Sequence, residues 1–192
     1  MSEERPFCYY FGYGSNLLSN RMKLKNKTAI KVGVGILKDF KLTFSGQSSL
    51  WKGSTANIVP AKGSTVIGVV WKVFDTNILD KQELHYDPIN VQVTLTRLEC
   101  GSTTCENQSA DSVNENTILK NGQVLTCRVY VQREDHQSLK KQGTPSRGYK
   151  NVILKGMKEN SFPKDYIESL INTPDNGVIP EEMAQLVPEC LG

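Results

Sequence analysis

The chain has 192 residues, of which 38% are hydrophobic and 22% are charged, values typical of a globular protein large enough to bury a core. A formal net charge of +3 is too small to indicate a nucleic-acid binder, and no long apolar run predicts a membrane span. The first six residues lack the basic and apolar regions of a secretory signal, so we expect a cytoplasmic protein.

The N-terminal segment predicts a strand, a tight turn and a helix. A polar tail at residues 1–6 precedes an aromatic run at residues 7–11, which predicts the first strand. Gly12 and Gly14 then permit a tight turn and close approach of a ligand to the backbone. Apolar residues follow at helical spacing, so backbone N–H groups at the helix start would suit a carboxylate or phosphate. The spacing matches neither a P-loop nor a dinucleotide fingerprint, and a plain connection without a ligand stays open.

Strands dominate the first two-thirds of the chain. Runs rich in Val, Ile, Thr and aromatic residues predict six more of them, at residues 32–37, 40–44, 56–59, 66–74, 91–98 and 124–132. So many strands at short spacing indicate a small barrel or a strongly curved sheet. The polar stretch at residues 100–123 is predicted to be an extended hairpin connection, and residues 136–148 form a second linker.

Helices are fewer and lie mainly near the C-terminus. Asp75 can cap a short helix at residues 76–84, and Ser146 can cap a longer one with apolar residues at three- and four-residue steps. Pro163 and Pro180 each open a further helix. The expected fold class is α+β, a small mixed β-barrel with peripheral helices, in a single domain over residues 7–192.

The remaining residue types argue against other kinds of site. No Cys-x-x-Cys is present, and His85 and His136 lack zinc-ligand spacing, so no metal is expected. The five cysteines are odd in number and scattered, which favours free thiols, although Cys100 and Cys105 could bridge locally. A basic run at residues 21–31 has no interleaved aromatic residues, so it is interpreted as a solvated face rather than a nucleic-acid surface.

Three blocks of residues together resemble the γ-glutamylcyclotransferases. The first is Tyr-Gly-Ser-Asn-Leu at residues 13–17, after an aromatic strand. The second is Gly-Val-Val-Trp at residues 68–71, followed by Leu-Asp-x-x-Glu at residues 79–83. The third is Pro-Ser at residues 145–146 with Tyr149, Gly-Met-Lys-Glu-Asn at residues 156–160 and Pro-Lys-Asp-Tyr at residues 163–166. They occur in family order and span roughly residues 7 to 172, and the resemblance implies the same barrel fold.

The resemblance implies an enzyme that converts a γ-glutamyl-amino acid into 5-oxoproline and a free amino acid, without a cofactor. Glu83 matches the family's general acid/base. From the residues alone a solvent-exposed glutamate would be the first expectation, although burial beside the apolar strand would raise its pKa. The predicted substrate-binding residues are Tyr10, Phe11, Gly12, Tyr13, Gly14, Ser15 and Tyr149. Alternatives remain open for three of these, because Tyr149 and Tyr13 can be packing residues and Ser15 can cap a helix.

The chain departs from the family pattern after the glutamate, where residues 85–88 are unlike the family's glycine-containing segment and a second departure follows. Ungapped counting puts Asn90 where the family usually has a tyrosine before the strand that follows the glutamate, and Tyr86 could replace it if the loop is rearranged. This departure leaves open a non-catalytic relative that acts as a binding or scaffold protein. Asn16 favours the dipeptide-type enzyme over the glutathione-specific kind. The resemblance also implies a homodimer, although no residue marks a dimer surface.

Overall fold

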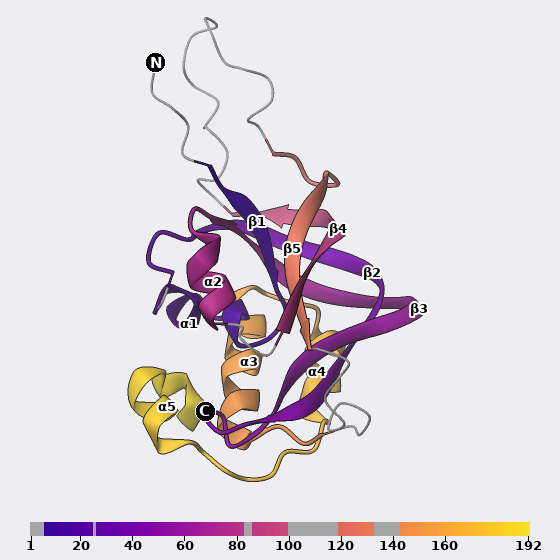
Figure 1. Ribbon diagram of the computed structural model, residues 1–192. Coiled ribbons are helices and arrows are strands. Elements are labelled where there is room, and N and C mark those ends of the chain that lie inside the picture. Colours follow the sequence, from indigo (N-terminus) through magenta and orange to yellow (C-terminus); the bar gives the residue numbers. More distant parts are fainter. Residues whose placement is uncertain (1–5, 25, 83–85, 100–118, 133–142) are drawn as a thin grey trace, which may run out of the picture.

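The computed structural model describes residues 6–24, 26–82, 86–99, 119–132 and 143–192 (Figure 1). Within these residues, five strands close a mixed barrel in the order β1-β3-β2-β4-β5. Their bounds are β1 (Cys8–Gly12), β2 (Ile30–Ser48), β3 (Gly53–Val73), β4 (Tyr86–Leu98) and β5 (Val124–Gln132). β1 and β5 pair in parallel and the other neighbours are antiparallel, so the expected α+β mixed barrel is confirmed.

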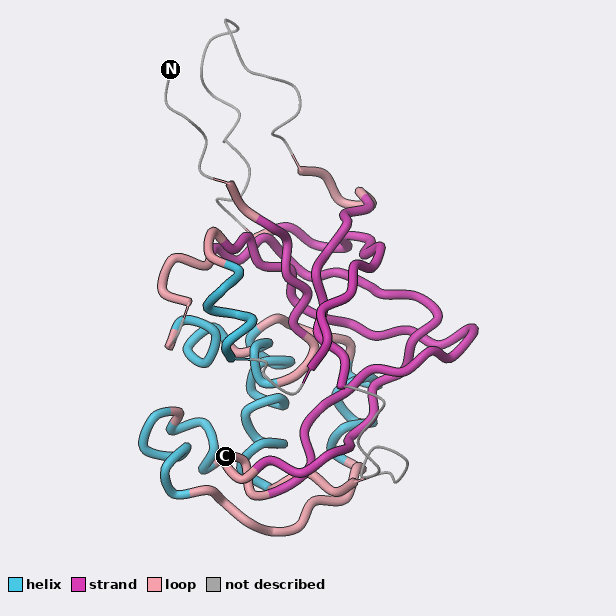
Figure 2. The backbone as a smooth tube through the Cα atoms, in the orientation of Figure 1, coloured by secondary structure: helices cyan, strands magenta, loops and turns pink. Residues whose placement is uncertain are grey.

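The strands are longer than the sequence predicts. The two strands expected at residues 32–37 and 40–44 are one strand, β2, in which Asp39 adopts φ 62° and the pairing register shifts between Lys38 and Phe40. Such a bulge bends a strand without ending it. β3 likewise joins two predicted strands, and the β2–β3 hairpin extends well beyond the barrel (Figure 2).

The beginning of β4 was predicted five residues too late. The strand starts at Tyr86, and residues 86–90 pair with β5 in continuous register. Pro88 lies within this segment, and proline cannot donate to a ladder. Pairing of β4 with β2 begins only at Val93, so residues 86–90 are paired on one side, where proline is tolerated.

The helices lie outside the barrel, with α3, α4 and α5 grouped at the end away from the start of β1 (Figure 1). Within the described residues, the helical elements are η1 (Ser15–Leu17, a 3₁₀ turn), α1 (Ser19–Lys23), α2 (Thr76–Gln82), α3 (Arg147–Glu159), α4 (Lys164–Ile171), α5 (Glu181–Leu186) and η4 (Pro188–Leu191, a 3₁₀ turn). In the described part of the chain, none of the helices is long and apolar enough to span a membrane.

Two predicted helix caps are confirmed and one predicted helix is interrupted. The N–H of Asn77 donates to the Asp75 carboxylate (3.0 Å), and the N–H of Tyr149 donates to the Ser146 hydroxyl (3.2 Å). The helix expected after the glycine turn is instead η1 followed by α1, because Leu18 between them has an extended backbone (φ −82°, ψ 124°).

The basic run at residues 21–31 is predicted to be a solvated face, and this prediction is wrong for two of its residues. Arg21 is buried, and its guanidinium lies 5.9 Å from the centroid of the Trp51 ring. Lys31 is part-buried and pairs with Glu99 (3.1 Å) and Glu159 (3.6 Å). These two side chains therefore pack against or pair with other parts of the chain instead of only facing solvent.

Candidate active site

The glycine turn, residues 12–15, connects β1 to η1 and is held by the residue that follows it. Asn16 is buried; its side-chain amide donates to the Tyr10 hydroxyl (2.9 Å), and its carbonyl accepts from the Trp71 indole (3.1 Å). The first bond ties the turn to β1 and the second ties it to β3. Asn16, singled out in the sequence as a mark of substrate type, thus has a structural task as well.

The predicted binding residues of this segment divide into core side chains and accessible backbone. Phe11 is fully buried, and the buried Tyr13 donates its hydroxyl to the backbone carbonyl of Tyr130 (2.5 Å). Gly14 and Ser15 are half-buried, and among the described residues nothing accepts a hydrogen bond from their backbone N–H groups. The Ser15 side chain does not cap η1, although capping was one of the two predicted alternatives.

Tyr149 brings α3 to the glycine turn. Its hydroxyl accepts a hydrogen bond from the Ala56 N–H of β3 (3.1 Å), and a Cβ built on Gly14 would lie 3.0 Å from the same oxygen. Its ring packs against the rings of Trp51 (centroids 4.7 Å apart) and Phe44 (6.5 Å). The ring is therefore a packing residue of the core, as one of the two alternatives predicted, while substrate contact by the hydroxyl at the turn stays a prediction.

A second tyrosine hydroxyl reaches the same part of β3. Tyr86 donates to the Ala56 carbonyl (3.1 Å) and lies 2.7 Å from the Thr55 hydroxyl. The side-chain amide of Gln132, on β5, donates to both the Tyr86 hydroxyl (3.1 Å) and the Thr55 hydroxyl (3.0 Å). Tyr149 thus contacts the N–H of Ala56 and Tyr86 contacts its C=O, both beside the turn.

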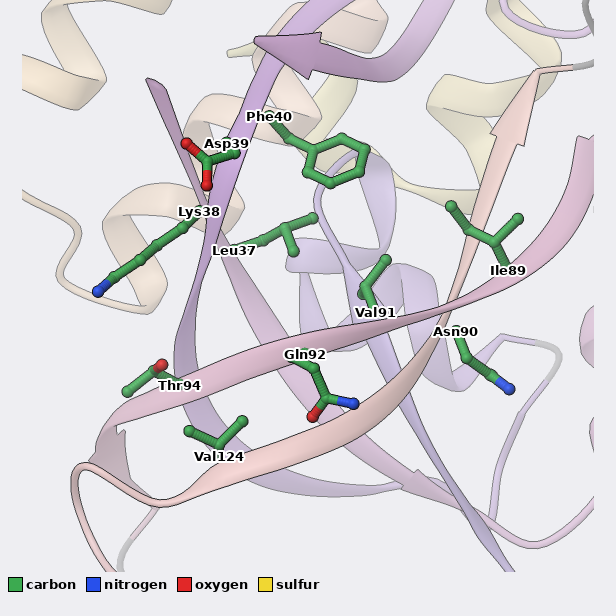
Figure 3. A pocket seen from close by; sticks show the side chains of 10 residues that line it. All are labelled: Leu37, Lys38, Asp39, Phe40, Ile89, Asn90, Val91, Gln92, Thr94 and Val124. Carbon is green, nitrogen blue, oxygen red and sulfur yellow. The ribbon is translucent and has the colours of Figure 1, made fainter. Parts of the chain in front are cut away.

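Asn90 lies further along β4 than Tyr86. Its side chain is exposed and helps to line a cavity of about 500 Å³ between β2 and β4, together with Phe40, Ile89 and Val91 (Figure 3). None of the predicted binding residues lines this cavity. Asn90 pairs with Arg128 on β5, and Arg128 in turn pairs with Tyr10 on β1, whereas Tyr86, the weighed replacement, bonds directly to Ala56 beside the glycine turn.

Glu83, the predicted acid/base, lies outside the described residues, so its role stays a prediction. The helix α2 that precedes it is described, and Asp80 of that helix belongs to a polar cluster with two β5 residues. Arg128 donates to the Asp80 carboxylate (2.6 Å), and Tyr130 donates to the same oxygen (2.5 Å). Arg128 also donates to the Tyr130 hydroxyl (3.0 Å).

The charges of this cluster stabilise its ionised form. Partial burial alone would raise the pKa of Asp80, but the hydrogen bonds from Tyr130 and Arg128 outweigh burial, and the pKa is lowered. Burial and the bond to Asp80 raise the pKa of Tyr130, so its hydroxyl keeps its proton and donates it. Asp80 therefore stays ionised at neutral pH and is poorly suited to carry a proton back and forth.

Sequence reasoning assigned no role to Arg128, Tyr130 or Gln132. The residues alternate along β5 at positions 128, 130 and 132, and this period of two was the available signal. It shows that they share a strand face; it does not show that Asp80, 48 residues earlier than Arg128, lies opposite.

Comparison with known proteins agrees with the barrel fold. The AIG2-like family model matches residues 65–170. The chain is 35% identical to the γ-glutamylcyclotransferase of Bos taurus, over 97% of this chain and 90% of that protein, and 32% identical to the one of Homo sapiens, over 96% and 89%. A solved γ-glutamyl cyclotransferase structure is 31% identical and superimposes with a TM-score of 0.74 over 96% of this chain and 99% of that one. The chain therefore belongs to the γ-glutamylcyclotransferase family of enzymes.

Proposed function

We propose that the protein is a γ-glutamylcyclotransferase that converts γ-glutamyl-amino acids into 5-oxoproline and a free amino acid. The observation that supports this most directly is the meeting of the glycine turn and the Tyr149 hydroxyl at Ala56. It occurs in a chain that is similar to named γ-glutamylcyclotransferases over nearly its whole length.

The glycine turn binds the glutamyl end of the substrate. The N–H groups of Gly14 and Ser15 donate to substrate oxygens, for which the α-carboxylate is one candidate. The hydroxyls of Tyr149 and Tyr86, both at Ala56, form the neighbouring wall. Backbone donors that are already in place lose little freedom when the substrate binds, so they also suit an oxyanion that forms during the reaction.

Glu83 acts as the general acid/base. It takes a proton from the α-ammonium of the substrate, and the freed amine attacks the γ-carbonyl carbon to form a five-membered ring. The C–N bond to the second amino acid then breaks as Glu83 returns this proton to the departing amine, and the second proton of the ring nitrogen passes to that amine or to water, which leaves the lactam N–H of 5-oxoproline. Nucleophile and electrophile belong to one molecule, so holding them in contact supplies roughly several kcal/mol of the barrier.

The proposal is tested by incubating the protein with γ-glutamyl-alanine and measuring 5-oxoproline by mass spectrometry. Glu83→Gln keeps the size of the side chain but cannot exchange a proton, so we expect kcat to fall about 100- to 10,000-fold. Glu168→Gln, an exposed residue of α4, is the matched control and should retain the parent rate.

Two results would count against the proposal, in different ways. Full turnover by Glu83→Gln would remove Glu83 from the reaction. The absence of 5-oxoproline from the parent protein, across a panel of γ-glutamyl dipeptides and glutathione, would favour the alternative of a non-catalytic binding protein.

A further inference from the structure

Asp80, Arg128 and Tyr130 form a closed triangle of hydrogen bonds, here called the α2 clamp. Each member contacts the other two, with donor–acceptor distances of 2.5, 2.6 and 3.0 Å. Arg128 and Tyr130 come from β5, which is a barrel strand, and Asp80 comes from α2, which lies outside the barrel. The α2 clamp therefore joins a peripheral helix to the rigid part of the molecule.

The same strand also holds the glycine turn. The backbone carbonyl of Tyr130 accepts the hydroxyl of Tyr13, within the turn, at 2.5 Å. The Tyr130 ring packs edge-on against the ring of Tyr10 (centroids 5.9 Å apart), and Tyr10 pairs with Arg128 across β1 and β5. Tyr130 thus contacts the turn through its carbonyl and ring, and α2 through its hydroxyl.

The helix depends on such a clamp, because few other contacts orient it among the described residues. α2 has seven residues, too few to be stable alone. Leu79 is fully buried while Ile78 is exposed, so apolar packing holds the helix mainly at one point. A single apolar anchor permits rotation and tilt, whereas the bonds to Asp80 add a second fixed point one residue further on.

We infer that the α2 clamp positions α2, the helix that precedes the proposed acid/base Glu83 in the chain, relative to a substrate held in the glycine turn. This inference rests on the proposed function, in which Glu83 transfers the proton. Asp80, Arg128 and Tyr130 are then positioning residues that act through Glu83 and do not touch the substrate. A displacement of about 1 Å of a reacting group can lower a rate about 100-fold, so the effect of loosening the clamp is measurable.

Tyr130→Phe is the most direct variant. It removes the hydroxyl that bonds to Asp80 and Arg128, and it leaves the carbonyl that receives Tyr13 and the ring that packs on Tyr10. We expect kcat for γ-glutamyl-alanine to fall about 10-fold while KM changes less than about twofold, because the turn that binds the substrate is intact.

Tyr166→Phe is the matched control. The Tyr166 hydroxyl also makes a hydrogen bond from a helix to the barrel, since it accepts from the Ile67 N–H of β3 (3.2 Å), but it belongs to α4. Its loss should lower the unfolding temperature about as much as Tyr130→Phe does and leave both kcat and KM at the parent values.

Asp80→Asn provides the second test, because it removes the charge from the helix side of the same clamp. It should lower kcat like Tyr130→Phe, and the double variant should be hardly worse than the poorer single one, since both changes release one element. An unchanged kcat in both single variants would overturn the inference, as would a loss expressed mainly in KM or an equal loss in Tyr166→Phe. Activity that is abolished by Glu83→Gln but unaffected by Tyr130→Phe would refute the clamp alone, whereas activity that survives Glu83→Gln would refute the proposed function.

Discussion

At the scale of single residues, the space beside Gly14 leaves little room for a side chain. A Cβ at this position would lie 3.0 Å from the Tyr149 hydroxyl and 3.1 Å from the Ala56 side chain. Gly14 has φ −113°, so the need for glycine here comes from this close approach and not from a left-handed backbone.

Gly14→Ala should therefore displace either the turn or the tyrosine. We expect about 1–3 kcal/mol of lost stability from overpacking and a fall in kcat/KM of at least about 10-fold from the displaced N–H groups. Urea unfolding and the 5-oxoproline assay measure the two effects. Parent-like activity in a folded Gly14→Ala protein would mean that the turn takes no part in binding.

At the scale of secondary structure elements, Lys150 holds the chain that follows α4 against α3. It is buried, and its ammonium donates to the carbonyls of Ile171 and Thr173 and to the Asp175 carboxylate (3.4 Å). Asp175 also accepts from Arg147 (3.3 Å) and from the Gly177 N–H (3.0 Å). Partial burial alone would raise the pKa of Asp175, but these bonds outweigh burial and lower it.

The lowered pKa predicts how stability depends on pH. Because the carboxyl binds its proton less readily in the folded state, Asp175 stabilises the fold fully above the ordinary pKa of about 3.9. That stabilisation is lost as the pH falls through the lowered pKa. Asp175→Asn should therefore cost about 1–2 kcal/mol of unfolding free energy near pH 7, and the difference from the parent protein should shrink to nothing toward pH 2. Urea titrations over this pH range measure the difference in unfolding free energy. A difference that does not vary with pH would contradict the lowered pKa of Asp175.

At the scale of the whole molecule, the barrel depends on close contact between β2 and β4. A side chain at Gly33 would overlap the backbone carbonyl of Arg97 on the neighbouring strand. Backbone atoms cannot yield as the end of a flexible side chain can, so the two strands would have to separate.

Gly33→Ala should thus weaken closure of the barrel as a unit. We expect a loss of about 2–3 kcal/mol and a fall in unfolding temperature of about 5–10 °C, with a control, Thr65→Ala on an exposed position of β3, close to the parent value. Calorimetry measures both. An unchanged transition would show that the strands can part there at little cost.

Local sequence patterns were sufficient to predict much of the structure of this protein. The glycine turn, the caps at Asp75 and Ser146 and the apolar cores of the strands were predictable, because spacing and periodicity along the chain determine them directly. The beginning of β4 was not predictable from local pattern. Pro88 is compatible with a strand only when one side of that strand is unpaired, and the pairing of the barrel strands decides which side is unpaired.

The sequence by itself determined the family, the strand-rich fold and the candidate residues, since these follow from motifs whose members lie close together along the chain. Only the tertiary structure decided which of them meet: Tyr149 with Gly14, Tyr86 rather than Asn90 beside Ala56, and Asp80 with Arg128 and Tyr130. The physical reason is that such pairs are joined by hydrogen bonds and packing between distant segments. Periodicity reveals which face of a strand or helix a residue occupies but not which partner that face will contact.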